Sequence, residues 1–503
     1  MTSFDLPTEI LDAKTHGAAV DSLRDAGVLL PTFAQLADPS LIPDAVLARL
    51  RSVGPDAPDS ANLFRVHWHN DAARRDQVGV TGYLDLPRSL TGVGARIVVA
   101  LGERFPMIGA HKVLAAYACL VPRIVAGCFD PTRQRAVWPS TGNYCRGGVA
   151  ISRILGCRSV AVLPEGMSAE RFDWLRRWVA DPADIIPTPG SESNVKEIYD
   201  KCAELSENPE NVILNQFSEF ANYLVHWLCT GKALQRVFEE LRASEPDLRL
   251  AAFVAGSGSA GTLGAGDHLK QGYGARIVVV EPVECPTLLC NGFGEHNIQG
   301  IGDKHIPLIH NVMNGDLVVG VSDQSSDALN LLFNSDVGRS YLRSRRRLSP
   351  ELVDSLSSLG LSGIANVLAA IKTARRLELD ERDVIITVAT DSARLYVSER
   401  DRWQATRFPK GFDEISAAEL FGEHLLSPDG DHMLEMSHRD RRRIFNLGYF
   451  TWVEQQGVRL EDFEKRSRQR FWLGLRDFIP AWDELIERFN RDTGLAQRAG
   501  IAA

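Results

Sequence analysis

Between residues 96 and 389, short runs of apolar residues alternate with longer stretches in which apolar residues recur every three to four positions. The short runs predict buried strands, and the longer stretches predict helices. Strands that are apolar on both faces and separated by helices are typical of a parallel sheet covered on both sides. The sequence therefore predicts an α/β fold. The predicted strands are Ile97–Leu101, Ala136–Pro139, Ser159–Leu163, Asp184–Pro187, Val212–Phe217, Leu250–Val254, Arg276–Glu281, Leu317–Val321 and Val384–Ala389.

The two ends of the chain depart from this alternation. Residues 1–90 are mixed and predict two short helices, Asp21–Leu29 and Asp44–Val53. From residue 415 onward the pattern predicts only helices, rich in charged and aromatic residues. An N-terminal extension and a helical C-terminal extension therefore flank the α/β core. The C-terminal helices are predicted at Ala417–Leu426, Arg439–Gln455, Leu460–Phe478 and Trp482–Arg491.

Composition indicates a globular protein with no nucleic-acid or membrane partner. Of 503 residues, 44% are hydrophobic and 24% are charged, and the net charge of −9 disfavours binding to phosphate-rich surfaces. No apolar run reaches the roughly 18 residues of a membrane helix, and the start shows no secretory signal. The eight cysteines form no CxxC pair, which favours reduced thiols in a cytoplasmic protein.

The segment His67-Trp68-His69 would place two histidines on one face of a strand. Two such imidazoles can begin a metal site, but zinc sites use at least three protein ligands. No third ligand stands nearby in the sequence. A structural role is therefore favoured, and no metal is predicted.

A glycine-rich loop joins the predicted strand at Leu250–Val254 to a helix. Gly256, Gly258 and Gly261 allow a sharp turn and close backbone approach to a ligand. Successive N–H groups before a helix N-terminus form a nest that suits a phosphate group. A plain strand–helix turn is the simpler interpretation, and a dinucleotide site with Glu281 as its acidic partner is a further alternative.

Two other segments carry candidate chemistry. Ser140-Thr-Gly-Asn143 follows a strand and precedes a helix, where hydroxyl and N–H groups can grip a carboxylate, although an N-cap loop explains the same residues. Lys112 follows Gly109-Ala-His111 and opens an apolar helical run. Most lysines are solvated surface residues, so this lysine gains weight only from the loops around it.

These segments, taken in order, resemble the fold-type II family of pyridoxal-phosphate enzymes, in particular the cysteine synthase and cystathionine β-synthase branch. Each motif is modest, but the ordered series over roughly residues 90–400 is specific. The matching segments are Arg104–Lys112, Pro139–Asn143, Asn215–Asn222 with His226, Val254–Thr262, Val280–Val283, Ile298–Gly302, Gly360–Gly363 and Asp391–Tyr396.

The resemblance implies a catalytic core at 91–400, with a smaller subdomain at about 138–232, between extensions at 1–90 and 401–503. It implies two doubly wound α/β domains with pyridoxal 5'-phosphate in the cleft between them, and a homodimer. The function implied is β-replacement on a small amino acid (serine, O-activated serine or cysteine) through an aminoacrylate, with a small nucleophile as second partner. The alternative is β-elimination, which releases a keto acid and ammonia.

The resemblance also implies a role for each matching residue. Lys112 would form the Schiff base and move the proton at the substrate Cα. Asn143 would bond the cofactor's phenolic oxygen, and Ser362 would face the pyridine nitrogen. A serine there stabilises a protonated pyridine less than an aspartate would, which disfavours transamination. The cofactor phosphate would be held by Gly258, Ser259, Ala260, Gly261 and Thr262. The substrate carboxylate would be held by Ser140, Thr141, Gly142 and Gln216.

Three positions depart from the branch. Phe105 stands where an asparagine is usual, and the segment before Lys112 resembles that of the tryptophan synthase β-subunit. His111 is therefore expected at the phosphate. Tyr144 replaces a small threonine in the substrate loop, which leaves the substrate's size open. A scaffold with a degenerate cofactor site and a nucleotide-dependent oxidoreductase are the competing functions.

Overall fold

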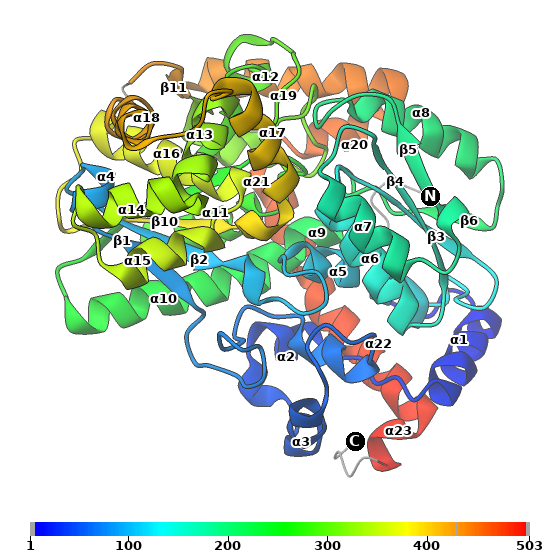
Figure 1. Cartoon of the computed structure of the whole chain (residues 1–503). Helices are drawn as coiled ribbons and strands as arrows, with labels where there is room; N and C mark the ends of the chain where they lie inside the picture. The colour runs from blue at the N-terminus through cyan, green and yellow to red at the C-terminus, as the bar shows by residue number, and fades with distance from the viewer. Residues whose placement is uncertain (1–5, 429, 499–503) are drawn as a thin grey trace.

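Two sheets form the centre of the computed structural model, which describes residues 6–428 and 430–498 (Figure 1). The strands are β1 (Tyr83–Leu86), β2 (Arg96–Leu101), β3 (Arg135–Pro139), β4 (Arg158–Pro164), β5 (Ile185–Thr188), β6 (Asn211–Ile213), β7 (Arg249–Gly256), β8 (Arg276–Pro282), β9 (Leu317–Val321), β10 (Asp383–Ala389) and β11 (Met433–Glu435). The larger sheet has the order β1-β2-β10-β7-β8-β9-β11, and the smaller has the order β5-β4-β3-β6. Only the two edge strands of the larger sheet, β1 and β11, pair antiparallel among the described residues.

Alternate residues of the central strands point into two separate cores. On β2, Val98 and Ala100 join one core, and Ile97 and Val99 join the other. Helix α11 (Leu263–Tyr273) contributes to the first core and α16 (Leu361–Arg376) to the second. A strand buried on both faces needs side chains that are apolar throughout, which explains the β-branched runs. The predicted α/β fold is confirmed.

Helix α5 (Lys112–Val125) lies at the heart of the molecule (Figure 1). All of its residues are buried except Lys112 and Arg123. It packs against α6 (Asn143–Ile154) of the smaller sheet, and Gly147 lets the two helices approach closely. A Cβ at Gly147 would lie 2.9 Å from the Cα of Val113. The apolar run after Lys112 is therefore a core helix with a lysine at its first residue.

The two terminal extensions pack against each other and against α5. Helix α22 (Phe478–Thr493) contacts α1 (Ala13–Asp25) and α5. The Asp483 carboxylate accepts hydrogen bonds from the backbone N–H groups of Phe33 and Ala34, at 2.6 and 3.0 Å. Trp482 donates to the Pro7 carbonyl at 2.9 Å. Segments from opposite ends of the chain thus complete one core.

Some predicted boundaries are wrong. Helix α1 begins after Asp12, whose carboxylate accepts from the N–H groups of Lys14 and Thr15, and ends before Gly27, which has a φ of 65°. The prediction of a helix at Asp21–Leu29 missed both of these signals. By contrast, α3 (Asp44–Ser52) agrees with its prediction.

The C-terminal extension is helical as predicted, with two differences. The predicted helix Leu460–Phe478 is broken into α20 (Leu460–Lys465) and α21 (Gln469–Gly474), separated by a turn. The short strand β11 was not predicted, and it adds an edge to the larger sheet beside β9. Three residues carry too little periodicity to identify a strand.

Several other features bear on the predictions. Over residues 6–428 and 430–498, no single helix has the length and apolarity to cross a membrane. One pair of consecutive helical segments, Pro350–Ser358 and Leu361–Arg376, has the required length and apolar composition when the two are taken together, but the pair is bent by 116° at the break between them. All eight cysteines are free. The boundaries at 90, 400 and 138–232 remain predictions.

Candidate active site

The Lys112 side chain meets the glycine-rich loop. Its amine donates a hydrogen bond to the Ser259 hydroxyl at 3.0 Å, across 147 positions of sequence. The turn before α5 has Met107 and Gly109 at φ values of 64° and 58°, and it leads directly into the helix. The fold therefore brings together the predicted lysine and the predicted phosphate loop.

Burial lowers the pKa of Lys112 to about 8, because the charged amine loses water. The nearby carboxyl groups of Asp303 and Glu192 act in the opposite direction and favour the charged form. A substantial fraction of the amine is then neutral near pH 8. A neutral amine is the form that acts as nucleophile and base.

Between Gly256 and Thr262 the backbone lies so close to neighbouring groups that side chains at its glycines would clash with them. A Cβ at Gly258 would lie 2.5 Å from the Gly300 carbonyl oxygen, and one at Gly261 would lie 2.3 Å from the Asn222 amide oxygen. Ala260 adopts a φ of 64°. The N-terminus of α11 follows at once, so the N–H groups of the turn can face an anion.

Two side chains hold this loop from behind. The Asn222 amide donates to the Ser259 hydroxyl at 3.0 Å. The His111 Nε2 lies 3.3 Å from the Thr262 hydroxyl. Complete burial sets the pKa of His111 well below its ordinary value, so the ring is neutral. His111 thus lies next to the predicted phosphate loop through Thr262.

Two small adjoining cavities, of about 10 and 20 Å³, meet at Lys112. The first is lined by the glycine loop and by Ser362, near the start of α16. The second is lined by Ser140, Thr141 and Gln216. Lys112 lies at the boundary between a face built from the glycine loop and a face built from the substrate loop. The residues shared by both cavities are Lys112, Gly258, Ser259, Gly300 and Thr390.

The predicted residues are thus gathered around Lys112, with three set back from the cavities. His111, Gly142 and Gly261 do not line either space. A Cβ at Gly142, which has a φ of 145°, would meet the Arg171 side chain at 2.4 Å. Tyr144, the unusual residue of the substrate loop, lines the second cavity.

Two buried carboxyl groups line the second cavity and were not predicted from the sequence. The Thr141 side chain and the Gly300 backbone act to lower the pKa of Glu192, but burial has the larger effect and raises it to about 8. Burial and the neighbouring Glu192 raise the pKa of Asp303 well above its ordinary value. Glu192 Oε2 and Asp303 Oδ2 have no hydrogen-bond partner. Asp303 directly follows the Ile298–Gly302 motif, which was a usable signal, whereas Glu192 belongs to no motif.

Asn143 is held in a buried polar network. Its amide donates to Asp391 at 2.6 Å, and its carbonyl accepts from Arg146 at 2.9 Å. Arg171, at 3.6 Å from Asp391, adds a second guanidinium. Tyr396 donates to the same carboxylate at 2.9 Å. This network fixes the Asn143 side chain at the edge of the second cavity and leaves it one further N–H donor.

Other candidates from the sequence have different roles in the structure. The Glu281 carboxylate accepts from the N–H groups of Leu288 and Leu289, each at 2.8 Å, so it caps a helix and does not face the glycine loop. His67 and His69 do not lie on a strand. In the described part of the chain, no group of three or more His, Cys, Asp or Glu residues is arranged to hold a metal.

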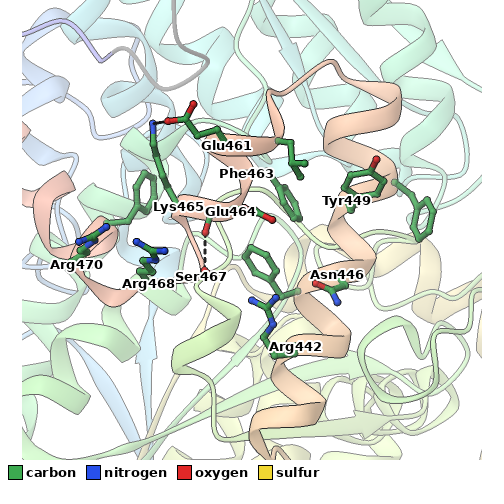
Figure 2. A pocket seen from close by; sticks show the side chains of 14 residues that line it. Arg442, Asn446, Tyr449, Glu461, Phe463, Glu464, Lys465, Ser467, Arg468 and Arg470 are labelled. Carbon is green, nitrogen blue, oxygen red and sulfur yellow. Dashed lines mark hydrogen bonds and ion pairs between the residues drawn. The ribbon is translucent and has the colours of Figure 1, made fainter.

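A hollow of about 1090 Å³ lies in the C-terminal extension (Figure 2). Helix α19 (His438–Tyr449) supplies Arg442 and Tyr449, and α20 supplies Phe463 and Lys465. It contains none of the predicted site residues. Size alone therefore does not identify the reactive site, which is recognised by its convergent groups.

The groups around Lys112 fit a phosphate-bearing aldehyde. The amine can react with a carbonyl, and the turn of the glycine loop before α11 can direct N–H groups at an anion. Ser362, Asn143 and the hydroxyls of Ser140 and Thr141 provide neutral polar contacts around the space between them. Such a set suits an organic cofactor that carries one anionic tail.

Comparison with known proteins agrees with this chemistry. Residues 74–332 match the family described as "Pyridoxal-phosphate dependent enzyme". A probable cysteine synthase of Bacillus subtilis is 30% identical over 331 residues, which is 65% of this chain and 96% of that protein. Cystathionine beta-synthase of Saccharomyces cerevisiae is 28% identical, over 63% of this chain and 60% of that protein. A hydrogen sulfide-producing enzyme of Fusobacterium nucleatum has a similar structure, with a TM-score of 0.51 and 25% identity over 65% of this chain and 88% of that one.

Proposed function

This chain belongs to the family of pyridoxal-phosphate-dependent enzymes, and from that premise we propose that it catalyses β-replacement on a small amino acid. The substrate class is serine, O-activated serine or cysteine. The observation that carries the proposal is the Lys112 amine, held 3.0 Å from Ser259 within the glycine loop. Its relatives named as cysteine synthase support replacement over other reactions of the family.

The cofactor would be held by two groups of residues. Gly258, Ser259, Ala260, Gly261 and Thr262 would surround its phosphate, with His111 behind them. Asn143 and Ser362 would contact the ring. When bound, pyridoxal phosphate supplies a carbonyl for amines and a ring that stabilises negative charge at the substrate Cα.

Lys112 would act twice in this chemistry, first as the amine that holds the cofactor and then as the base at the substrate Cα. Its pKa of about 8 suits both tasks, because a base works best when its pKa lies near the working pH. Ser140, Thr141, Gly142 and Gln216 would orient the substrate carboxylate. Orientation matters because only a proton directed at the lysine can be removed.

The second candidate is β-elimination, which yields a keto acid and ammonia. The solved hydrogen sulfide-producing enzymes with a similar fold favour it. The two candidates differ in whether a nucleophile adds at the substrate Cβ, or the unsaturated product leaves the enzyme and is hydrolysed at the carbon that bears its nitrogen. Tyr144 and Phe217 give the second cavity buried walls, which would limit exchange with solvent and so support replacement.

One panel of reactions tests the proposal. The enzyme, reconstituted with pyridoxal phosphate, is incubated with O-acetylserine, O-phosphoserine, serine or cysteine, each with and without sulfide. Replacement predicts a new amino acid whose formation depends on the added nucleophile. Keto acid and ammonia formed at the same rate with and without sulfide would favour elimination instead. No product from any of the four, with cofactor bound, would contradict both.

A further inference from the structure

A hollow of about 450 Å³ lies in the N-terminal extension, outside the chemistry described above. Its walls come from α3 and from the segment between Arg65 and Gln77. Three arginines but only one carboxylate are among the residues that line it. The lining residues are Leu47, Leu50, Arg51, Arg65, His67, Asn70, Arg75, Asp76 and Gln77.

Arg65 is a buried cation that forms no ion pair with any residue the structure describes. It is 2% exposed, and its guanidinium donates only to neutral oxygens, namely those of Leu50, Val53 and Asn62. Loss of water and the nearby Arg75 and Arg74 lower its pKa, and the carboxylates of Asp71 and Asp76 only partly oppose this effect. Buried charges in proteins are normally paired, so an anion in the hollow would remove an electrostatic cost.

His67 lines the same hollow and has a ring nitrogen without a partner. The ring is wholly buried, and its Nδ1 accepts from the His69 N–H at 3.1 Å. Burial lowers the pKa of His67 to about 3, so the ring is neutral and its one proton lies on Nε2. The Phe64 carbonyl is near the ring, but no acceptor meets Nε2 with hydrogen-bond geometry.

Gln77 adds a second donor without an acceptor, because its buried Nε2 has no partner. Arg75 forms no ion pair among the described residues and reaches only the Val53 carbonyl, at 3.3 Å. The one carboxylate in the lining is Asp76, which is exposed and lies 3.4 Å from Arg51. Donors therefore outnumber acceptors at the inner wall of the hollow.

We propose that this hollow binds a small molecule that carries a phosphate or a similar oxyanion. Oxygens of such a group can accept from Arg65, Arg75, His67 and Gln77 together. Charge-assisted bonds to guanidinium groups are the strongest available to it. A volume of about 450 Å³ exceeds the needs of phosphate alone and leaves room for an organic part of the ligand.

The hollow is placed to influence Lys112. Trp68, next to His67, packs its ring against the His111 ring at 5.4 Å between centroids. The same indole donates to the Thr230 hydroxyl at 2.8 Å. His111 directly precedes Lys112 and contacts Thr262 of the glycine loop. A ligand that fixes His67 therefore acts on a chain of packed side chains that ends at the reactive amine.

Binding of inorganic phosphate and of adenosine monophosphate to the cofactor-loaded enzyme tests the site, with chloride at equal ionic strength as reference. Calorimetry should show binding of one or both, and the stronger of the two identifies a free or an attached phosphate. The variant Arg51→Gln/Arg75→Gln should weaken binding by about tenfold or more, as expected for loss of a charge-assisted bond. Both arginines are exposed, so the fold should survive.

Arg49→Gln is the matched control, since Arg49 lies on the same helix but pairs with Asp59 outside the hollow. Its affinity for phosphate should equal that of the unchanged enzyme. Equal affinity in the double variant, or no binding beyond that of chloride, would overturn the proposal. If phosphate binds but leaves turnover unchanged, the influence on Lys112 is refuted while the site stands.

Discussion

The two faces of Lys112 are built in opposite ways. On the face that we propose for the cofactor, called the cofactor face, the glycine loop and Ser362 contribute backbone groups and hydroxyls, and no carboxylate lines the cavity. On the face that we propose for the substrate, called the substrate face, Glu192 and Asp303 line the cavity, and Arg171 and Asp391 lie just behind it. One face has no carboxyl group and is shaped by backbone, whereas the other is lined by buried carboxyl groups and shaped by side chains.

This difference has a physical reason. A phosphate group can be recognised by successive backbone N–H groups that point at it, so a short loop with glycines where the backbone must turn is sufficient. A substrate is distinguished by the groups that surround it, which come from several segments and carry charge. We therefore expect changes on the cofactor face to affect cofactor binding, and changes on the substrate face to affect pH dependence and choice of substrate.

Lys112→Ala should have the largest effect, because this residue belongs to both faces. Loss of the amine removes the nucleophile and the base together, so turnover should fall by about 10³-fold or more. Product formation and the visible absorption of the bound cofactor measure the two roles. Lys232→Ala, at an exposed lysine, is the control. Turnover retained by the Lys112 variant would refute the assignment of this lysine.

Gly258→Ala tests the cofactor face. The added methyl would lie 2.5 Å from the Gly300 carbonyl oxygen, so the loop must shift, at a cost of about 1–3 kcal/mol. Cofactor affinity should fall by about tenfold or more. Gly272→Ala provides the same chemical change where nothing lies within 4 Å. Titration of cofactor into both variants gives the comparison, and equal affinities would show that the loop does not approach the cofactor.

The two faces also differ in how well they can be predicted from the sequence. The strands and the glycine loop were predicted because their signals are local, such as the apolar run of β10 and the spacing of Gly256, Gly258 and Gly261. The carboxyl groups that line the second cavity were not predicted, because only tertiary contacts bring them together. Asp391 meets Asn143 across 248 positions of sequence.

The terminal extensions show the same limit. Their amphipathic helices follow from periodicity, but nothing in the pattern of α22 indicates that Asp483 caps the segment at Phe33, 450 positions away. The hollow in the N-terminal extension is a similar case. Arg51, Arg65 and Arg75 are spaced 14 and 10 residues apart, which fits no helical or strand period, and only the fold brings them together.

Glu192→Gln tests the substrate face through pH. The pKa of Glu192 is about 8 in the fold, against 4.5 for the free group. Between these pH values the unfolded carboxyl is ionised while the folded one is protonated, so stability falls as the pH rises from 4.5 to 8. The variant should lack this fall. Its advantage should grow over that range to a few kcal/mol at most, since each pKa unit corresponds to about 1.4 kcal/mol.

Urea unfolding at pH 5 and pH 9 measures this difference, with cofactor bound in every sample. Glu204→Gln, at an exposed position, is the control and should follow the unchanged enzyme at both pH values. If the Glu192 variant and the unchanged enzyme lose the same stability between these pH values, the carboxyl is already ionised in the fold. The substrate face would then be less desolvated than its burial indicates.

Ser362→Asp should have the smallest effect on rate, and it asks whether the absence of a carboxyl group from the cofactor face matters. Ser362 is 3% exposed, so a carboxylate there would be desolvated and would favour a protonated partner. If it faces the pyridine nitrogen, the stronger electron sink should increase transamination a few-fold relative to the main reaction. Ser362→Asn has the same size without the charge and should leave the product ratio unchanged. Equal ratios in the two variants would mean that the serine does not tune the ring, and that the absence of a carboxyl group from this face serves only to accommodate the cofactor.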